Sequence, residues 1–210
     1  MQPEAFPLIR LDLAFESISG IIALIIAYYA TKAYNLTDQK RLADLSTGFF
    51  VLAIGMFSHV IGTWYFYVRL GIEGDIVPEV RTTMTIVTLV YHFLQIMAYG
   101  LFVLSTRRGG RGKQPEMVTL MALPVLLDSN LELITILLML VVVVQALMNY
   151  ATVRNRFALY VFSGFFLIFL NHLVLMTAEE NVLRYLLSQG LQFLGFIALL
   201  LMVYKVGREE

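Results

Sequence analysis

The chain has 210 residues, of which 59% are hydrophobic and only 14% are charged. Soluble domains carry about 25% charged residues, so this composition excludes an ordinary soluble protein and indicates one built within a membrane. Fifteen basic and fifteen acidic residues give a formal net charge of zero, and the lack of cysteine excludes disulfides, thiolate metal sites, iron–sulfur clusters and a cysteine nucleophile.

Six apolar runs are long enough to cross a bilayer, since a helix needs about 20 apolar residues to span a hydrocarbon core of about 30 Å. They cover residues 18–34, 45–68, 83–105, 133–150, 157–177 and 182–204. A shorter run, 117–127, is interrupted by Pro124 and lies between the third and fourth of these. Its length alone would suit an interfacial or re-entrant segment.

The distribution of basic residues favours a crossing by this short run as well, because cytoplasmic loops are enriched in lysine and arginine. With seven spans, 11 basic residues face one side and 4 the other; without this crossing the split is 8 to 7. The larger set is Lys32, Lys40, Arg41, Arg107, Arg108, Arg111, Lys113, Arg154, Arg156, Lys205 and Arg208, and the smaller is Arg10, Arg69, Arg81 and Arg184. We therefore predict a multi-pass cell-membrane protein with its N-terminus outside and its C-terminus in the cytoplasm.

The two halves of the chain share a register at an offset of 116 residues, although apolar helices also resemble one another by composition alone. The matching pairs are Phe15-Glu16-Ser17-Ile18 with Leu131-Glu132-Leu133-Ile134, Tyr34 with Tyr150, and Gly48-Phe49-Phe50 with Gly164-Phe165-Phe166. The third and seventh spans align through Leu94-Gln95 and Leu191-Gln192. The predicted fold is all-α: seven transmembrane helices forming two parallel three-helix repeats, 1–105 and 131–210, joined by a basic loop and short linker helix, 106–130.

This three-plus-one-plus-three arrangement resembles the topology of SWEET-type sugar carriers, whose halves are parallel repeats. Microbial rhodopsins also have seven spans, but here the only lysine of the last span, Lys205, lies at its cytoplasmic end, which argues against a retinal Schiff base. The stretch Tyr29-Ala-Thr-Lys-Ala-Tyr34-Asn-Leu-Thr37, followed by Leu42-x-x-Leu45-x-x-Gly48-Phe49, resembles archaeal polytopic membrane proteins of uncharacterised function. That resemblance covers about 20 residues and implies a helical hairpin and an archaeal source, but no activity.

The chain has three histidines, His59, His92 and His172, and each lies inside a long apolar run. Ionisable side chains at membrane depth are costly and often mark functional sites. Span midpoints predict His59 and His92 near the midplane, and His172 about one turn nearer the outer face in a separate polar layer with Asn171. The histidines are interpretable as hydrogen-bonding groups between helices, as part of a polar substrate or proton pathway, as axial ligands of haem b, or as ligands of a divalent metal.

Several neighbouring residues bear on these alternatives. Gly55 and Gly62 flank His59 and would let a flat macrocycle approach the helix.

Glu16 and Glu132 open the first and fifth spans, where carboxylates offset the helix dipole. The alternative interpretation of these two glutamates is a symmetric pair guarding an outward cavity. At the repeat offset His59 aligns with Leu175, and His172 with Met56, so the two copies differ; a duplicated ligand pair is more often symmetric, which favours histidines that only form hydrogen bonds. Gly48 and Gly164 are predicted helix-packing positions.

The sequence favours a non-enzymatic role while leaving enzymatic activity open. We predict a small receptor-like or transporter-like module, or a membrane subunit of a larger complex, with a polar site in the outer half of the membrane. The site candidates are His59, His92, His172, Asn171, Gln95, Gln192, Glu16 and Glu132. The alternative is a b-type haem or metal-binding electron-transfer subunit with the three histidines as ligands. Expected partners are the lipid bilayer and a protein partner or a second copy of the chain. The basic run at 107–113 lacks aromatic residues, which argues against nucleic acid.

Overall fold

The computed structural model describes residues 5–73, 78–106, 131–177 and 182–209. Their secondary structure is entirely helical, in the order α1 (Ala5–Thr37), α2 (Lys40–Glu73), α3 (Pro78–Thr106), α5 (Leu131–Val153), α6 (Arg156–Met176) and α7 (Val182–Glu209). All six helices are long and apolar enough to cross a membrane, and each coincides with one of the six long predicted spans. The chain is therefore an all-α, polytopic membrane protein. The short predicted span at 117–127 lies outside the described residues.

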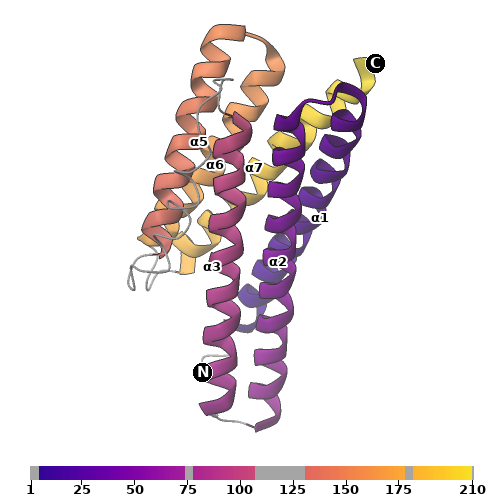
Figure 1. The fold of residues 1–210 in the computed structure, drawn as a ribbon. Coiled ribbons are helices and arrows are strands. Elements are labelled where there is room, and N and C mark those ends of the chain that lie inside the picture. Colours follow the sequence, from indigo (N-terminus) through magenta and orange to yellow (C-terminus); the bar gives the residue numbers. More distant parts are fainter. Residues whose placement is uncertain (1–4, 74–77, 107–130, 178–181, 210) are drawn as a thin grey trace.

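The main helix contacts close a ring in which α1 packs on α2, α2 on α3, α3 on α5, α5 on α6, α6 on α7, and α7 on α1. Figure 1 shows that α1, α3, α5 and α7 run in one direction, and α2 and α6 in the other. The contact between α1 and α7 is parallel, because Phe15 meets Phe193 at one end while Tyr29 and Tyr204 line a common small pocket toward the other. We call α1–α3 the N-terminal trio and α5–α7 the C-terminal trio.

Two tight turns, one in each trio, lie at the same end of the bundle, which we call the turn end. Asp38 and Arg154 adopt positive φ angles of 52° and 50°. Their backbone N–H groups donate to the carbonyl oxygens of Tyr34 and Tyr150, in both cases at 2.8 Å. This is the left-handed cap that ends many helices. The two turns have the same geometry at positions 116 residues apart.

The centre of the bundle is filled by an aromatic cluster of Phe49, Phe102 and Phe165, each no more than 1% exposed. Ring centroids lie 4.6 Å apart for Phe49 and Phe102, 5.4 Å for Phe102 and Phe165, and 6.4 Å for Phe49 and Phe165. Since α2 begins at the turn end, Phe49 lies about 14 Å along the bundle from it. This apolar layer separates the turn end from the polar residues described below.

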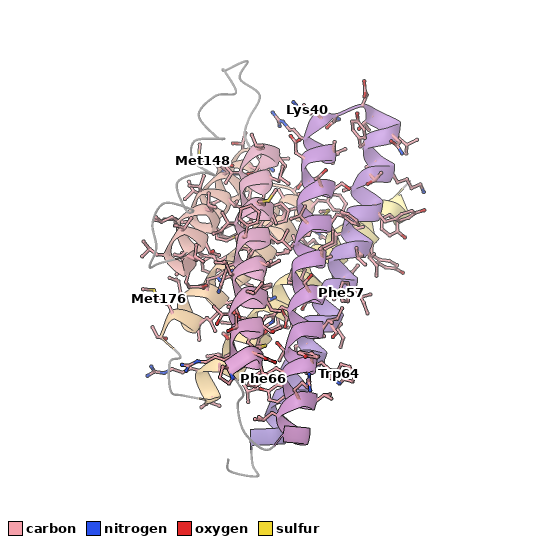
Figure 2. The ribbon with its side chains drawn as sticks, turned by 60° about the horizontal axis from the view of Figure 1, so that its bottom comes forward. Lys40, Phe57, Trp64, Phe66, Met148 and Met176 are labelled. Atoms are coloured by element: carbon pink, nitrogen blue, oxygen red, sulfur yellow. The ribbon has the colours of Figure 1, made fainter. Side chains whose placement is uncertain are left out.

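The trios differ in length away from the turn end, where the α2–α3 hairpin projects beyond the other helices (Figure 1). Helix α6 ends at Met176, whose counterpart at the repeat offset is residue 60, whereas α2 continues to Glu73. Trp64, labelled in Figure 2, lies on this extension and is 63% exposed. An exposed tryptophan is typical of the membrane–water interface.

Helix α1 also begins earlier than predicted, at Ala5 instead of near residue 18. Glu16 therefore lies about three turns inside the helix and does not offset the dipole at its start. That interpretation of Glu16 is wrong. Glu132, in contrast, is in the first turn of α5.

Candidate functional site

In the N-terminal trio, Glu16 of α1 and His59 of α2 form a close pair. The Nδ1 atom of His59 lies 2.8 Å from Oε2 and 3.0 Å from Oε1 of Glu16. The glutamate side chain is 5% exposed and the histidine side chain 22%. A carboxylate at this depth is costly to bury alone, and the imidazole supplies a partner for it.

In the C-terminal trio, Glu132 of α5 and His172 of α6 form the corresponding pair. Nδ1 of His172 lies 2.8 Å from Oε1 of Glu132, and its Nε2 lies 2.9 Å from the Tyr99 hydroxyl. Here the glutamate side chain is 24% exposed and the histidine 2%. The same bond thus joins the first and second helices of each trio.

Two expectations about the histidines are therefore wrong. Each trio does hold an equivalent histidine, because residues three apart on a helix share a face and an imidazole one turn away still reaches the glutamate. His172 is also not in a separate outer layer: it follows the start of α6 by 16 residues, whereas His59 follows the start of α2 by 19. The span midpoint misled this prediction because α2 extends well beyond the length of α6.

Both pairs line one polar cavity of about 170 Å³, to which all six described helices contribute. Its lining residues are Glu16, His59, Thr88, Tyr91, His92, Gln95, Glu132, Asn171, His172, Leu175, Tyr185, Gln189 and Gln192. All eight residues singled out from the sequence as ligand candidates are among them. The cavity lies on the side of the aromatic cluster away from the turn end, and Tyr99 joins the two by contacting both His172 and Phe102.

Three buried polar atoms at the cavity have no hydrogen-bond partner among the described residues: Nδ1 of His92, Oε1 of Gln95 and Oδ1 of Asn171. The other atoms of the two amides are used, since Asn171 Nδ2 donates to Gln192 Oε1 at 3.2 Å and Gln95 Nε2 donates to the Tyr99 hydroxyl at 3.3 Å. A buried polar group that makes no hydrogen bond costs about 1–3 kcal/mol. The cavity therefore offers hydrogen-bonding capacity to something that enters it.

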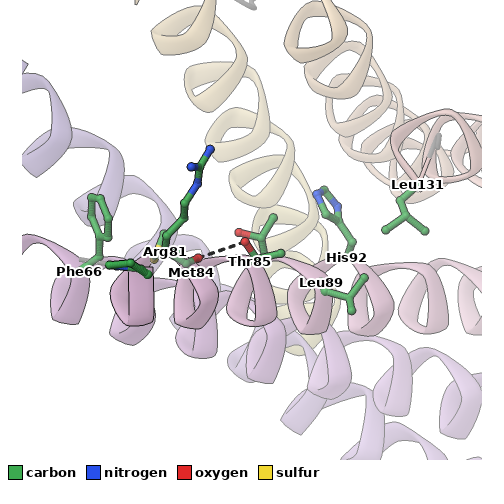
Figure 3. A pocket seen from close by; sticks show the side chains of 9 residues that line it. Phe66, Arg81, Met84, Thr85, Leu89, His92 and Leu131 are labelled. Atoms are coloured by element: carbon green, nitrogen blue, oxygen red, sulfur yellow. Dashed lines mark hydrogen bonds between the residues drawn. The ribbon is translucent and has the colours of Figure 1, made fainter. Parts of the chain in front are cut away.

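A larger groove of about 830 Å³ adjoins the cavity on the side away from the turn end. Its lining includes Phe66 of α2, Arg81 of α3 and Leu131 of α5, and it shares Thr88 and His92 with the polar cavity. Figure 3 shows Arg81 and His92 projecting from the same side of α3. Among the described residues, the groove gives the polar cavity an approach from that end of the bundle.

Sequence reasoning missed Thr88, Tyr91, Tyr185 and Gln189, although helical stripes on α3 and α7 would have revealed three of these four, Tyr91 being the exception. On α3 the stripe is Arg81, Thr85, Thr88, His92, Gln95 and Tyr99, at alternating spacings of four and three residues. Such spacing keeps side chains on one helix face. On α7, Tyr185, Gln189 and Gln192 repeat the part of the stripe that lines the cavity, at an offset of 97 residues from α3.

The geometry does not favour the metal and haem interpretations. Within the described ranges, no group of three histidine, aspartate or glutamate side chains is placed to hold a metal ion. The space beside Gly55 and Gly62 is taken up by Leu94 and Val87 of α3, so the idea that these glycines admit a macrocycle is wrong. Sites for drug-sized ligands enclose about 300–1,000 Å³, which is more than the polar cavity provides.

Gly48 and Gly164 lie at equivalent helix contacts. A β-carbon on Gly48 would lie 2.6 Å from the Phe102 ring and 3.2 Å from the Ala98 carbonyl oxygen, both on α3. A β-carbon on Gly164 would lie 2.6 Å from Leu199 and 3.0 Å from the Gly195 carbonyl oxygen, both on α7. The contact partners on α3 and α7 are again 97 residues apart.

Comparison of the chain with protein-family models, curated proteins and solved structures finds no match.

Proposed function

We propose that this protein is a carrier-like membrane module that binds a small polar solute in the polar cavity. The observation that carries the proposal is the convergence of two Glu–His pairs and three unpartnered polar atoms on one enclosed space within the spans. Polar groups within membrane spans are costly, and where they gather around a cavity they commonly mark a ligand site, a proton path or bound water. Since a water molecule occupies about 30 Å³, the cavity has room for about six waters or a solute of that size.

The proposed architecture is seven spans, with two parallel three-helix repeats around a linker span. Four observations support the repeat: the turns at Asp38 and Arg154, the Glu–His pairs, the glycine contacts, and the stripes on α3 and α7. An offset of 116 residues relates the first two helices of each trio, and an offset of 97 relates the third. Parallel repeats around a shared site near the centre are an established plan for secondary transporters.

The aromatic cluster supports a carrier over a simple pore. Phe49, Phe102 and Phe165 fill the bundle between the polar cavity and the turn end, while the groove reaches the cavity from the other end. With the turn end in the cytoplasm, as the basic residues favour, this arrangement corresponds to a site accessible from outside and closed inside. Transport would then require the cluster to part, as rocking of one trio against the other would achieve.

The proposed topology is tested with reporter fusions at Gly112 and after Glu210. Both reporters should be cytoplasmic if the chain crosses the membrane seven times with its N-terminus outside. Reporters on opposite sides would overturn the seven-span arrangement and with it the parallel repeat.

Solute binding is tested by thermal unfolding of the purified protein in lipid nanodiscs with a panel of small amines, amides, polyols and carboxylates. A ligand that binds only the folded state stabilises it by RT ln(1 + L/Kd), where L is the ligand concentration, so the unfolding temperature rises as L increases. Uptake of the hit into proteoliposomes then separates a carrier, which accumulates it, from a receptor, which only binds. No stabilisation by any of these small solutes would contradict the proposal. A protein partner or second copy is a further expectation, tested by the mass of the detergent-solubilised complex.

A further inference from the structure

The polar cavity presents hydrogen-bond acceptors and negative charge in excess of donors and positive charge. Gln95 and Asn171 line the cavity, are each 2% exposed, and carry amide oxygens without a hydrogen-bond partner among the described residues; an amide oxygen only accepts. Glu16 and Glu132 add two carboxylates. Within the part of the chain that the structure describes, no lysine or arginine lines the cavity. A ligand that satisfies this site must donate hydrogen bonds.

Each Glu–His pair carries one negative charge when its histidine is neutral and no net charge when the histidine is protonated. With both histidines neutral, the cavity encloses two negative charges in a medium where charges interact more strongly than in water. Burying that charge without compensation is costly, whereas a cation in the cavity would offset it. Arg81 lines the adjoining groove but not the polar cavity itself. It is 11 residues, or about 16 Å along α3, from His92.

We propose that the solute is a small organic cation with N–H donors, a primary ammonium ion of a few non-hydrogen atoms. This inference rests on the proposed solute-binding function and specifies its ligand class. An ammonium group donates up to three hydrogen bonds, enough for the Gln95 and Asn171 oxygens and one carboxylate. The volume of about 170 Å³ admits an ion the size of methylammonium or ethylammonium together with a few waters.

The experiment measures saturable binding of radiolabelled methylammonium to the wild-type protein in nanodiscs at pH 7.5. Glu16→Gln and Glu132→Gln keep the shape and hydrogen bonding of the side chains but remove one negative charge each. Each should raise Kd about tenfold, the effect of losing one charge-assisted contact. Glu79→Gln is the matched control, since Glu79 lies in the first turn of α3, outside the cavity lining, and should leave Kd unchanged.

A second measurement on the wild-type protein keeps the test valid if a variant fails to fold. Binding should weaken as the pH is lowered from 7.5 to 5.5, because protons taken up by the two Glu–His pairs would compensate the carboxylates in place of the ligand. The titratable groups that face the cavity are Glu16 from α1, His59 from α2, Tyr91 and His92 from α3, Glu132 from α5, His172 from α6 and Tyr185 from α7. Methylammonium itself stays protonated throughout this range.

Competition identifies the ligand class. Ethylammonium should displace the label, whereas tetramethylammonium, a cation without N–H donors, and acetamide, a neutral molecule, should not. Displacement by acetamide, with Kd insensitive to Glu16→Gln, would overturn the cation assignment while leaving a solute site in place. Displacement by both potassium and tetramethylammonium would indicate a site that selects for positive charge alone. That result would overturn the assignment of a ligand with N–H donors. Absence of binding by every amine probe, with a polyol or carboxylate still stabilising the protein, would overturn this inference and leave the proposed function in place.

Discussion

The two trios make the same hydrogen bond between glutamate and histidine but bury opposite partners. In the N-terminal trio the glutamate is enclosed and the histidine is open to the cavity; in the C-terminal trio the histidine is enclosed and the glutamate is open. The difference follows from the one-turn displacement of His172 toward the aromatic cluster, where Tyr99 also contacts it. The same Glu–His hydrogen bond therefore lies in two different electrostatic environments.

This asymmetry suits a site that must hold a ligand and release it. Two identical pairs would respond alike to a charge in the cavity, whereas an open glutamate and an open histidine present opposite chemistry to it. The packing differs as well, because α6 and α7 approach so closely that backbone faces backbone at Gly164 and Gly195, while Gly48 mainly faces the ring of Phe102. At these glycines, α6 and α7 therefore approach each other more closely through their backbones than α2 and α3 do.

The largest expected effect tests this difference in packing. Gly164→Leu should destabilise the protein by about 3 kcal/mol and Gly48→Leu by about 2 kcal/mol, since overpacking is costlier where a backbone must move than where a ring edge can shift. Unfolding in detergent with increasing denaturant measures both. Gly190→Leu on α7 and Gly71→Leu on α2 are the matched controls, because a β-carbon at either meets nothing within 4 Å. Equal losses at Gly48 and Gly164 would contradict the proposed difference between the trios.

The next effect tests the opposite burial of the pairs. His59→Ala should cost about 2 kcal/mol, because it removes the imidazole from a carboxylate that is only 5% exposed. Glu132→Ala should cost about 1 kcal/mol, since the enclosed His172 keeps its contact with the Tyr99 hydroxyl.

Unfolding in detergent with increasing denaturant, measured for these variants together with Glu16→Gln and His172→Gln, checks this order of stability losses. Glu16→Gln should be the mildest change, as it leaves a neutral amide beside His59. A larger loss for Glu132→Ala than for His59→Ala would mean that burial does not decide the cost of breaking each pair.

Hydropathy and charge predicted the six described spans, because a run of about 20 apolar residues is typical of a helix that crosses a membrane. The helix ends were predicted less well. Helix α1 starts thirteen residues before its predicted span, in a segment where Arg10 and Asp12 interrupt the apolar run. Charges near a helix end are tolerated at the membrane surface, so hydropathy does not mark where the helix itself begins.

The site residues were predictable by type but not by partner. Scarcity of polar groups within spans pointed to both glutamates, the three histidines and the three amides. Their pairing was not predictable, since Glu16 and His59 are 43 residues apart and Glu132 and His172 are 40 apart. A strict register pairs His59 with Leu175 and His172 with Met56, and only the positions of the helices in space show that one turn of displacement preserves the bond.

The smallest expected effect concerns the turns, the region where the trios agree most closely. Arg154 and Asp38 both have left-handed backbone, which costs a residue with a β-carbon about 1 kcal/mol, while aspartate tolerates it better than arginine does. Arg154→Gly should therefore stabilise the protein by about 0.5 kcal/mol, with the unfolded chain's extra freedom offsetting part of the gain. Asp38→Gly should be close to neutral. The preceding residues, Val153 and Thr37, end their helices, so glycine there should destabilise by about 0.5–1 kcal/mol and serves as the control. If Arg154→Gly were as damaging as Val153→Gly, the two turns would not share one backbone geometry, and the register that relates the trios would lose its most direct structural support.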